Sequence, residues 1–322
     1  MKEKKTGFPS LEFYDLAAEA AEVLRGEANT EIPGVKEEIT EIKGMRLSEI
    51  TVLNEKGSAA MGRPPGIYTT LEAGELLSPE ADKKPVIRTL SGVIRKMLPQ
   101  KPRLSVLICG IGNPAISSDA LGGKTTEHII ATRNLFSGEQ EENDVSVALF
   151  TPNVLGNTGI ESEEAVAALT KAIAPDVVFI VDALATSSFS RLATSFQITD
   201  TGLAPGGGIG NERPALNRAT LGVPVIAMGV PTVIYPHAIV AEAFATLREL
   251  LPEEKKSTAS RRWDAAEKRL YEQMDDPIRS FAVTPKDIDG VVADLSRILA
   301  GSIQVALHEE VTAENYREYT PL

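Results

Sequence analysis

Two aspartates, Asp119 and Asp182, are the residues of this sequence best placed to do chemistry. Asp119 ends "GIGNPAISSD", which follows the apolar run "LSVLIC", and Asp182 directly follows the apolar run "VVFIV". An acid beside a buried strand is costly unless it is paired or functional. Two such carboxyls close together do not both ionise easily, so one keeps its proton. The pair therefore offers an acid and a base near neutral pH, which suits attack of water on an amide.

The loop before Asp119 has the composition of a site-shaping turn. Gly110 and Gly112 allow a tight turn, and Asn113 can brace the backbone. "GIGN" lacks the third glycine of a GxGxxG motif, so it is weak evidence for a bound nucleotide. A second glycine loop, "APGGGIGNE", either lets backbone amides approach a ligand or serves as a connector. We expect it to shape the site through Gly206, Gly207 and Gly208.

Metal and thiol chemistry have little support. The three histidines, His128, His237 and His308, are scattered, no HExxH motif occurs, and the one cysteine, Cys109, lies inside an apolar run. We therefore predict no cofactor and no metal, with a buried structural thiol. One alternative stays open, in which Asp119, Asp182 and His237 hold a divalent ion.

The elements that must position these acids alternate in type. Apolar runs at 104–109, 145–150, 177–181 and 224–229 predict buried strands, and helical spacing marks 86–98, 123–136 and 162–173. This order predicts an α/β fold with a mostly parallel central sheet and helices on both faces. Loops at the carboxyl ends of such strands converge, so we expect the two acids to meet there. "TPKD" then predicts a closing helix with Thr284 as its N-cap.

The flanking segments differ from this α/β core. Residues 32–72 alternate apolar and polar side chains between turns, which predicts an N-terminal β meander. Residues 1–15 are expected to form a propeptide arm, and residues 16–322 a single domain. Residues 252–283 are strongly polar and predict a surface excursion.

Charge and composition limit the partners and the compartment. The chain of 322 residues has a net charge of −12 and no basic cluster, which argues against nucleic acid as a partner. We see no signal peptide and no uncharged apolar run of the roughly 18 residues that a membrane span needs. A single cysteine suits a reducing compartment. The sequence therefore predicts a cytoplasmic protein with no membrane partner.

Several long segments resemble the germination protease (spore protease) family of endospore-forming bacteria. They are "LICGIGNPAISSDALGGK", "IVDALATSSFSRLATSFQITDTGLAPGGGIGN", "TLGVPVIAMGVPTVI", "VTPKDIDGVVADLSRILAGSIQVALHEEVTAENYREYT" and "GMRLSEITVLNEKGSAAMGRPPGIYTTLEA". The resemblance implies an endopeptidase of the spore interior, made as a zymogen, that degrades small acid-soluble spore proteins at germination. It also implies an aspartic-type mechanism, with Asp119 in "SSDALG" and Asp182 in "IVDALA" as the matching essential aspartates. A homotetramer and a fold similar to hydrogenase-maturation endopeptidases are further implications.

The resemblance extends to a processing site. "EFYDLAAEA", residues 12–20, is similar to the self-cleavage site of the family and to the acid-then-apolar sites of its substrates. We therefore expect activation by cleavage between Asp15 and Leu16. Two departures are visible, because residues 252–283 look shortened and "IYPH" places His237 where the family pattern has no histidine.

Two other functions remain as alternatives at the level of sequence. One is a metal-dependent maturation-type endopeptidase that uses His237. The other is a noncatalytic ligand-binding α/β module built on the two glycine loops. The sequence does not assign which aspartate is the base and which is the acid, nor the trigger of activation.

Overall fold

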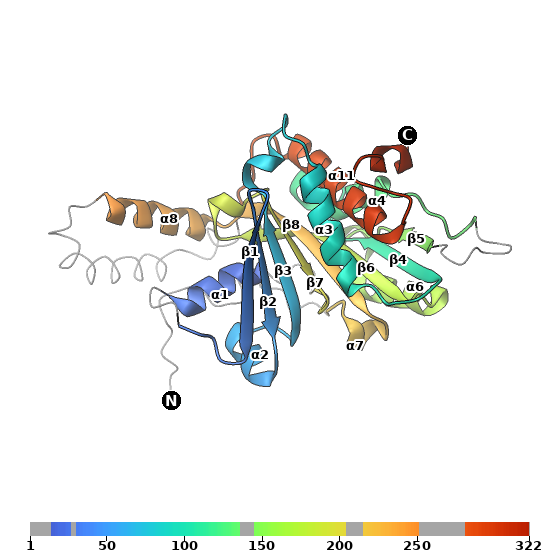
Figure 1. Cartoon of the computed structure of the whole chain (residues 1–322), viewed down its shortest axis with the longest axis horizontal. Helices are drawn as coiled ribbons and strands as arrows, with labels where there is room; N and C mark the ends of the chain where they lie inside the picture. Colours follow the sequence, from blue (N-terminus) through green and yellow to red (C-terminus); the bar gives the residue numbers. More distant parts are fainter. Residues whose placement is uncertain (1–13, 27–29, 136–144, 204–214, 251–280, 322) are drawn as a thin grey trace.

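The computed structural model describes residues 14–26, 30–135, 145–203, 215–250 and 281–321. They form one eight-stranded sheet in the order β1-β2-β3-β7-β8-β6-β4-β5, with helices on both faces (Figure 1). The predicted α/β class is therefore confirmed. The strands are β1 (Val35–Ile42), β2 (Met45–Val52), β3 (Gly66–Glu72), β4 (Leu104–Gly110), β5 (Val145–Phe150), β6 (Val177–Thr186), β7 (Ser195–Thr199) and β8 (Val225–Ile234).

The sheet is parallel from β8 through β6 and β4 to β5, as the continuous apolar runs predict. β6 and β8 are longer than the predicted apolar runs at 177–181 and 224–229. They extend to Thr186 and Ile234, because the two strands continue to pair beyond Asp182. Asp182 therefore lies within β6, although the sequence placed it directly after the strand. The neighbouring strand β4 ends beside Asp182, since its last residue, Gly110, pairs with Val181.

The other half of the sheet is antiparallel. β1, β2 and β3 pair in sequence as the predicted meander. β7, which the sequence analysis did not predict, is a strand of five residues that pairs antiparallel with both β3 and β8. This short strand joins the meander to the parallel half and makes one continuous sheet.

Helices cover the two faces in separate layers (Figure 1). α3, α4 and α11 pack on one face around the largest apolar cluster, whereas α1, α2, α6 and α7 pack on the other around two smaller clusters. α8 projects away from the sheet (Figure 1). The helices are α1 (Ala17–Arg25), α2 (Glu55–Met61), α3 (Lys84–Met97), α4 (Leu121–Glu127), α5 (Leu155–Thr158), α6 (Ser162–Ile173), α7 (Arg218–Leu221), α8 (Pro236–Glu249) and α11 (Ile288–Leu307), with short 3-10 turns such as η3 (Ser117–Asp119) between them.

The closing helix α11 begins later than predicted. Asp287, rather than Thr284, occupies its N-cap position, because the Thr284 hydroxyl donates to the Thr232 carbonyl of β8 at 2.9 Å. α11 is the one helix among the described residues that is long and apolar enough to span a membrane. Its side chains are mostly buried within the main apolar cluster, so it is the core helix of this fold.

Candidate active site

The loop after β4 holds Asp119 in a tight frame. The N–H of Asn113 donates to Asp119 Oδ2 at 2.7 Å, so the acid closes the turn that carries it. Gly112 has φ near 107°, and a side chain there would overlap the Asp119 carbonyl oxygen. Gly110 faces the carbonyl of Gly122 at the start of α4 and likewise leaves no room for a side chain. These residues therefore fit α4 and the Asp119 loop tightly onto the end of β4.

Asp182 is a nearly buried acid on the central strand β6, with 5% of its surface exposed. Its Oδ1 accepts a hydrogen bond from the N–H of Ala183 at 2.8 Å. The turn η3, which ends at Asp119, contacts both β6 and β8. The Thr232 hydroxyl fastens it there by donating to the Ser118 carbonyl at 2.6 Å. The two predicted acids thus lie on adjoining elements.

A row of paired residues extends from Asp182 across the sheet. Asp182 pairs with Gly229 of β8, and Gly229 pairs with Gln197 of β7. Residues paired in register direct their side chains to the same face of a sheet. The neighbours of Gln197, Phe196 and Ile198, belong to the cluster on the opposite face. Asp182 and Gln197 therefore share the face that carries α1, with one strand between them.

The predicted processing site lies on this same face. Gln197 Nε2 donates to the Asp15 carbonyl at 2.9 Å, and its Oε1 accepts from the N–H of Ala17 at 2.6 Å. The Asp15 carboxylate accepts from the N–H of Ala185 on β6 at 2.7 Å. Leu16, between these contacts, is fully buried. The bond between Asp15 and Leu16 is therefore held against the strands that carry Gln197 and Asp182.

Burial changes the protonation of the acids in this segment. Burial raises the pKa of the Asp15 carboxyl, while the Ala185 N–H and the charge of Arg63 act against that rise. Burial likewise raises the pKa of Glu19 to about 7. Glu19 accepts from the Thr186 hydroxyl and, at 3.0 Å, from the N–H of Ser187. The segment from Asp15 to Glu19 thus places two carboxyls against the carboxyl end of β6.

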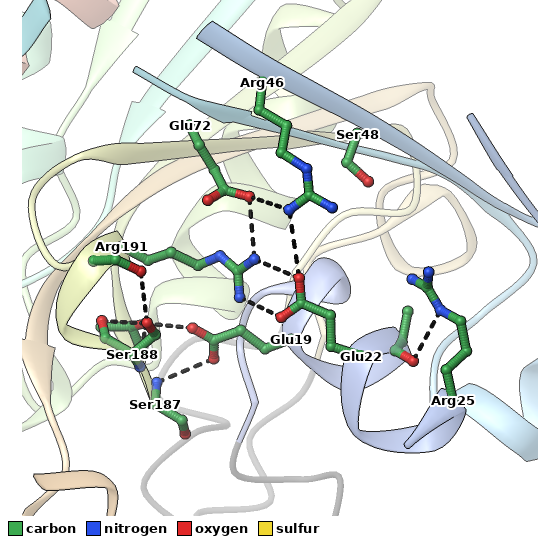
Figure 2. A network of polar contacts seen from close by, with 12 residues as sticks. Glu19, Glu22, Arg25, Arg46, Ser48, Glu72, Ser187, Ser188 and Arg191 are labelled. Carbon is green, nitrogen blue, oxygen red and sulfur yellow. Dashed lines mark hydrogen bonds and ion pairs between the residues drawn. The ribbon is translucent and has the colours of Figure 1, made fainter. Parts of the chain in front are cut away.

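A network of ion pairs fastens α1 to the sheet (Figure 2). Arg191 donates to both oxygens of Glu22, at 2.7 and 2.6 Å, and to Glu72 at 3.1 Å. Arg46 joins Glu72 at 3.1 Å and Glu22 at 3.5 Å. Its central member, the Arg191 side chain, is 7% exposed. A bidentate pair at a nearly buried arginine fixes the position of the helix more firmly than a surface pair does.

Several predicted features lie outside the described residues. They are Gly206, Gly207 and Gly208, nearly all of the 252–283 excursion, and the first 13 residues of the arm. His237 follows β8 in the first turn of α8, but its side chain is not among those described. The described residues contain no group of three or more His, Cys, Asp or Glu side chains that could hold a metal ion. The alternative with His237 thus stays untested.

Several residues of this region escaped sequence analysis. Gln197 is a polar residue between Phe196 and Ile198, and that alternation in "SFQIT" was the available signal for a strand with one polar face. Arg63 lies in the predicted turn "GRPPG", where a charged residue is ordinarily exposed. The residues next to Arg191 and Ala185 in the sequence give no pattern that predicts their contacts. Cys109 is buried in β4, as predicted, and burial raises its thiol pKa.

Comparison with known proteins shows relatives along nearly the whole chain. The chain is 35% identical over 315 residues to the germination protease of Caldanaerobacter subterraneus subsp. tengcongensis, covering 94% of this chain and 96% of that protein. It is 34% identical over 316 residues to the germination protease of Clostridium tetani, covering 95% and 98%. A solved hydrogenase maturation protease, HycI from Thermococcus kodakarensis, aligns over 44% of this chain and 80% of its own, at 21% identity and a TM-score of 0.30.

The family model described as "Germination protease" matches residues 10–266, which include both predicted acids and the predicted processing site. The expected family is thereby confirmed, together with the expectation of a hydrolase that cleaves proteins. The chain belongs to the germination protease family.

Proposed function

We propose that this protein is an aspartic-type endopeptidase that degrades small acid-soluble spore proteins at germination, with Asp119 and Asp182 as its catalytic residues. Membership of the family supports a germination endopeptidase. The observation that carries the proposal is the row from Asp182 through Gly229 to Gln197, because Gln197 holds the carbonyl of Asp15 on the face that carries Asp182. A candidate peptide bond and a candidate acid thus share one surface.

The chemistry is hydrolysis by a pair of carboxyls that share one proton. The ionised carboxylate takes a proton from water, and the hydroxide oxygen forms a bond to the peptide carbonyl carbon. The protonated carboxyl donates a hydrogen bond to the carbonyl oxygen. When the carbon–nitrogen bond breaks, the amine leaves with the proton of that carboxyl, and the pair is left with one proton again. The scheme holds for either assignment of Asp119 and Asp182 as base and acid.

The full-length chain is proposed to be a zymogen that is activated by cleavage between Asp15 and Leu16. The contacts of Gln197 and Ala185 with Asp15 support this proposal, since they hold that bond on the face that substrate must reach. Cleavage releases residues 1–15, and the chain that remains begins at Leu16, with α1 still joined to the sheet through Glu22 and Arg191. We further propose a homotetramer in the cytoplasm of the spore, with proteins rather than nucleic acids as substrates.

The experiment that tests the function compares Asp119→Asn and Asp182→Asn with the parental chain. Each amide keeps the volume of the acid but neither takes up nor gives up a proton near neutral pH, so we expect each to lower cleavage of a small acid-soluble spore protein at least about a thousandfold. Glu164→Asn, at an exposed position of α6, is the control. Circular dichroism checks that the variants are folded.

Two results would contradict the proposal. Near-parental turnover by either aspartate variant would remove that residue from the catalytic pair. Activity that disappears with a chelator, returns with a stoichiometric divalent ion and is lost in His237→Ala would replace it with the metal-dependent alternative.

A further inference from the structure

The main chain on both sides of Leu16 is bound by one side chain, that of Gln197. Both functional groups of the Gln197 amide contact main chain, with Nε2 on the Asp15 carbonyl and Oε1 on the Ala17 N–H. These contacts bracket Leu16 and depend on no side chain of the bound segment. Gln197 is 7% exposed, so the bracket is shielded from water. Any extended peptide could make the same two hydrogen bonds.

The side chain of Asp15 has a separate set of contacts, formed by the N–H of Ala185 and by Arg63, which we call the cradle. The pairing register of β6 and β8 shifts between Leu184 and Ala185, and the N–H of Ala185 donates to Asp15 Oδ2. Such bulges re-aim backbone groups and are frequent beside active sites. Arg63 donates to the carbonyl of Tyr14, and its charge favours the ionised form of Asp15. The Ala185 N–H and the charge of Arg63 thus lower the cost of burying an ionised Asp15, while burial still holds its pKa above the usual value.

The sheet beneath this segment is polar although it is buried. Thr70 of β3 pairs with Gln197, and Ser195 lies two residues before Gln197 on the same face of β7. Both side chains are fully buried, and within the described part of the chain neither hydroxyl oxygen has a hydrogen-bond partner. A sheet face that only packed against the alanines of α1 would need no hydroxyl side chains. Buried hydroxyls without a partner are rare, so these two mark this part of the sheet as more than a packing surface.

We propose that Gln197, the N–H of Ala185 and Arg63 form the subsite that binds an acidic residue and the peptide bond after it, and that Asp15 is its first occupant. The inference rests on the proposed function, because it takes the bond between Asp15 and Leu16 as the one that is cut. What the proposal adds to the acid-then-apolar pattern of the family's substrates is the set of residues that would read the acid, while the fully buried Leu16 marks the place of the apolar residue. Gln197 also donates to the oxygen on which negative charge develops when water attacks.

The first test changes only the substrate. The full-length chain is incubated until its own processing stops, and kcat/KM is measured for the peptide EFYDLAAEA, copied from residues 12–20, and for versions with Glu, Asn or Ala at the position of Asp15. We expect the acidic peptides to be cleaved at least about tenfold faster than the amide peptide, since the cradle loses its charged partner. Equal rates would overturn the subsite and leave the proposed function standing. If no peptide is cut by any form of the chain, the proposed function fails as well.

The second test changes the subsite. Arg63→Met should raise KM for the acidic peptide and abolish the preference over the amide peptide. Arg95→Met is its matched control, because Arg95 also donates to a main-chain carbonyl, that of Val305, on the opposite face of the sheet. An unchanged preference in Arg63→Met would exclude Arg63 from the subsite.

Gln197→Met should lower kcat for acidic and amide peptides alike, on the order of a hundredfold, since it removes a donor to the reacting carbonyl. Gln304→Met is its control, because Gln304 is also buried and donates to the main-chain carbonyl of His128 at 3.3 Å. Gln197→Glu keeps the acceptor for Ala17 but loses the donor. A merely structural role predicts parental kcat in every folded Gln197 variant, and that result would overturn the proposal.

Discussion

At the scale of single residues, Gly112 shows how closely the Asp119 loop is built. Its φ near 107° is a conformation that L side chains rarely adopt, and a Cβ would overlap the Asp119 carbonyl oxygen. We expect Gly112→Ala to lower the free energy of unfolding by about 1–3 kcal/mol. We also expect it to lower the rate of peptide cleavage relative to the parental chain, because Asp119 must shift. Chemical denaturation and a peptide assay measure the two effects.

Gly156→Ala is the control for this substitution, since Gly156 has ordinary backbone angles and open space around it. It should leave both stability and activity close to the parental values. If Gly112→Ala behaved in the same way, the loop would not constrain Asp119.

Glu19 is expected to make stability depend on pH. Burial raises its pKa from 4.5 to about 7 in the folded protein, so the folded state binds this proton more tightly than the unfolded chain does. The contribution is fully present below pH 4.5 and is lost as pH rises to about 7. The free energy of unfolding should fall across this window by at most about 1.4 kcal/mol per pH unit. Denaturant titrations at several pH values measure the slope.

Glu19→Gln should flatten that slope, because the amide does not titrate. Its one oxygen can accept from the N–H of Ser187, while its NH2 group can donate to the Thr186 hydroxyl. Glu164→Gln, at an exposed position, should keep the parental slope. A parental slope in Glu19→Gln would show that other groups dominate the pH dependence.

At the scale of elements, α1 depends on the arginine in the middle of the ion-pair network. Arg191→Met leaves Glu22 and Glu72 with Arg46 as their one shared partner in the network, and removes the bidentate pair to Glu22, whose side chain is 41% exposed. Allowing for that exposure, we expect a loss of roughly 1–3 kcal/mol, concentrated in the attachment of α1. Hydrogen exchange resolved along the chain should show faster exchange in residues 17–25 than in the central strands.

Arg297→Met removes an exposed pair with Asp294 at 3.2 Å and serves as the control. It should change stability by less than about 1 kcal/mol. Equal effects of the two substitutions would mean that the network does not anchor α1.

At the scale of the whole molecule, α11 packs on the sheet within the largest apolar cluster of the described residues, so we expect this core to contribute strongly to stability. Leu299 of α11 is fully buried in the main apolar cluster. Leu299→Ala should lower the free energy of unfolding by about 2–5 kcal/mol, through lost burial and the cavity that remains. Leu53→Ala, at a side chain that is 58% exposed, should cost far less. Denaturant unfolding of the two variants decides the point, and similar values would show that α11 is not part of the core.

Much of this protein follows from short-range sequence patterns. Apolar runs and helical spacing are local, so the alternation of strands and helices, the burial of Cys109 and the position of Asp119 in the loop after β4 could be predicted, whereas Asp182 lies within β6 rather than after it. β5 and α6 even have the predicted bounds. The division into an arm and one domain remains a prediction.

Only the tertiary structure decided which residues meet the processing segment. Gln197 and Asp15 are 182 positions apart, and Ala185 and Asp15 are 170 apart. Such contacts depend on which strands pair and in what register, and a shift of one residue would turn Gln197 to the opposite face. β7 has only five residues, too few for a clear periodic signal. The sequence therefore indicated the candidate acids, whereas the register of three strands placed a peptide bond on the face that carries Asp182.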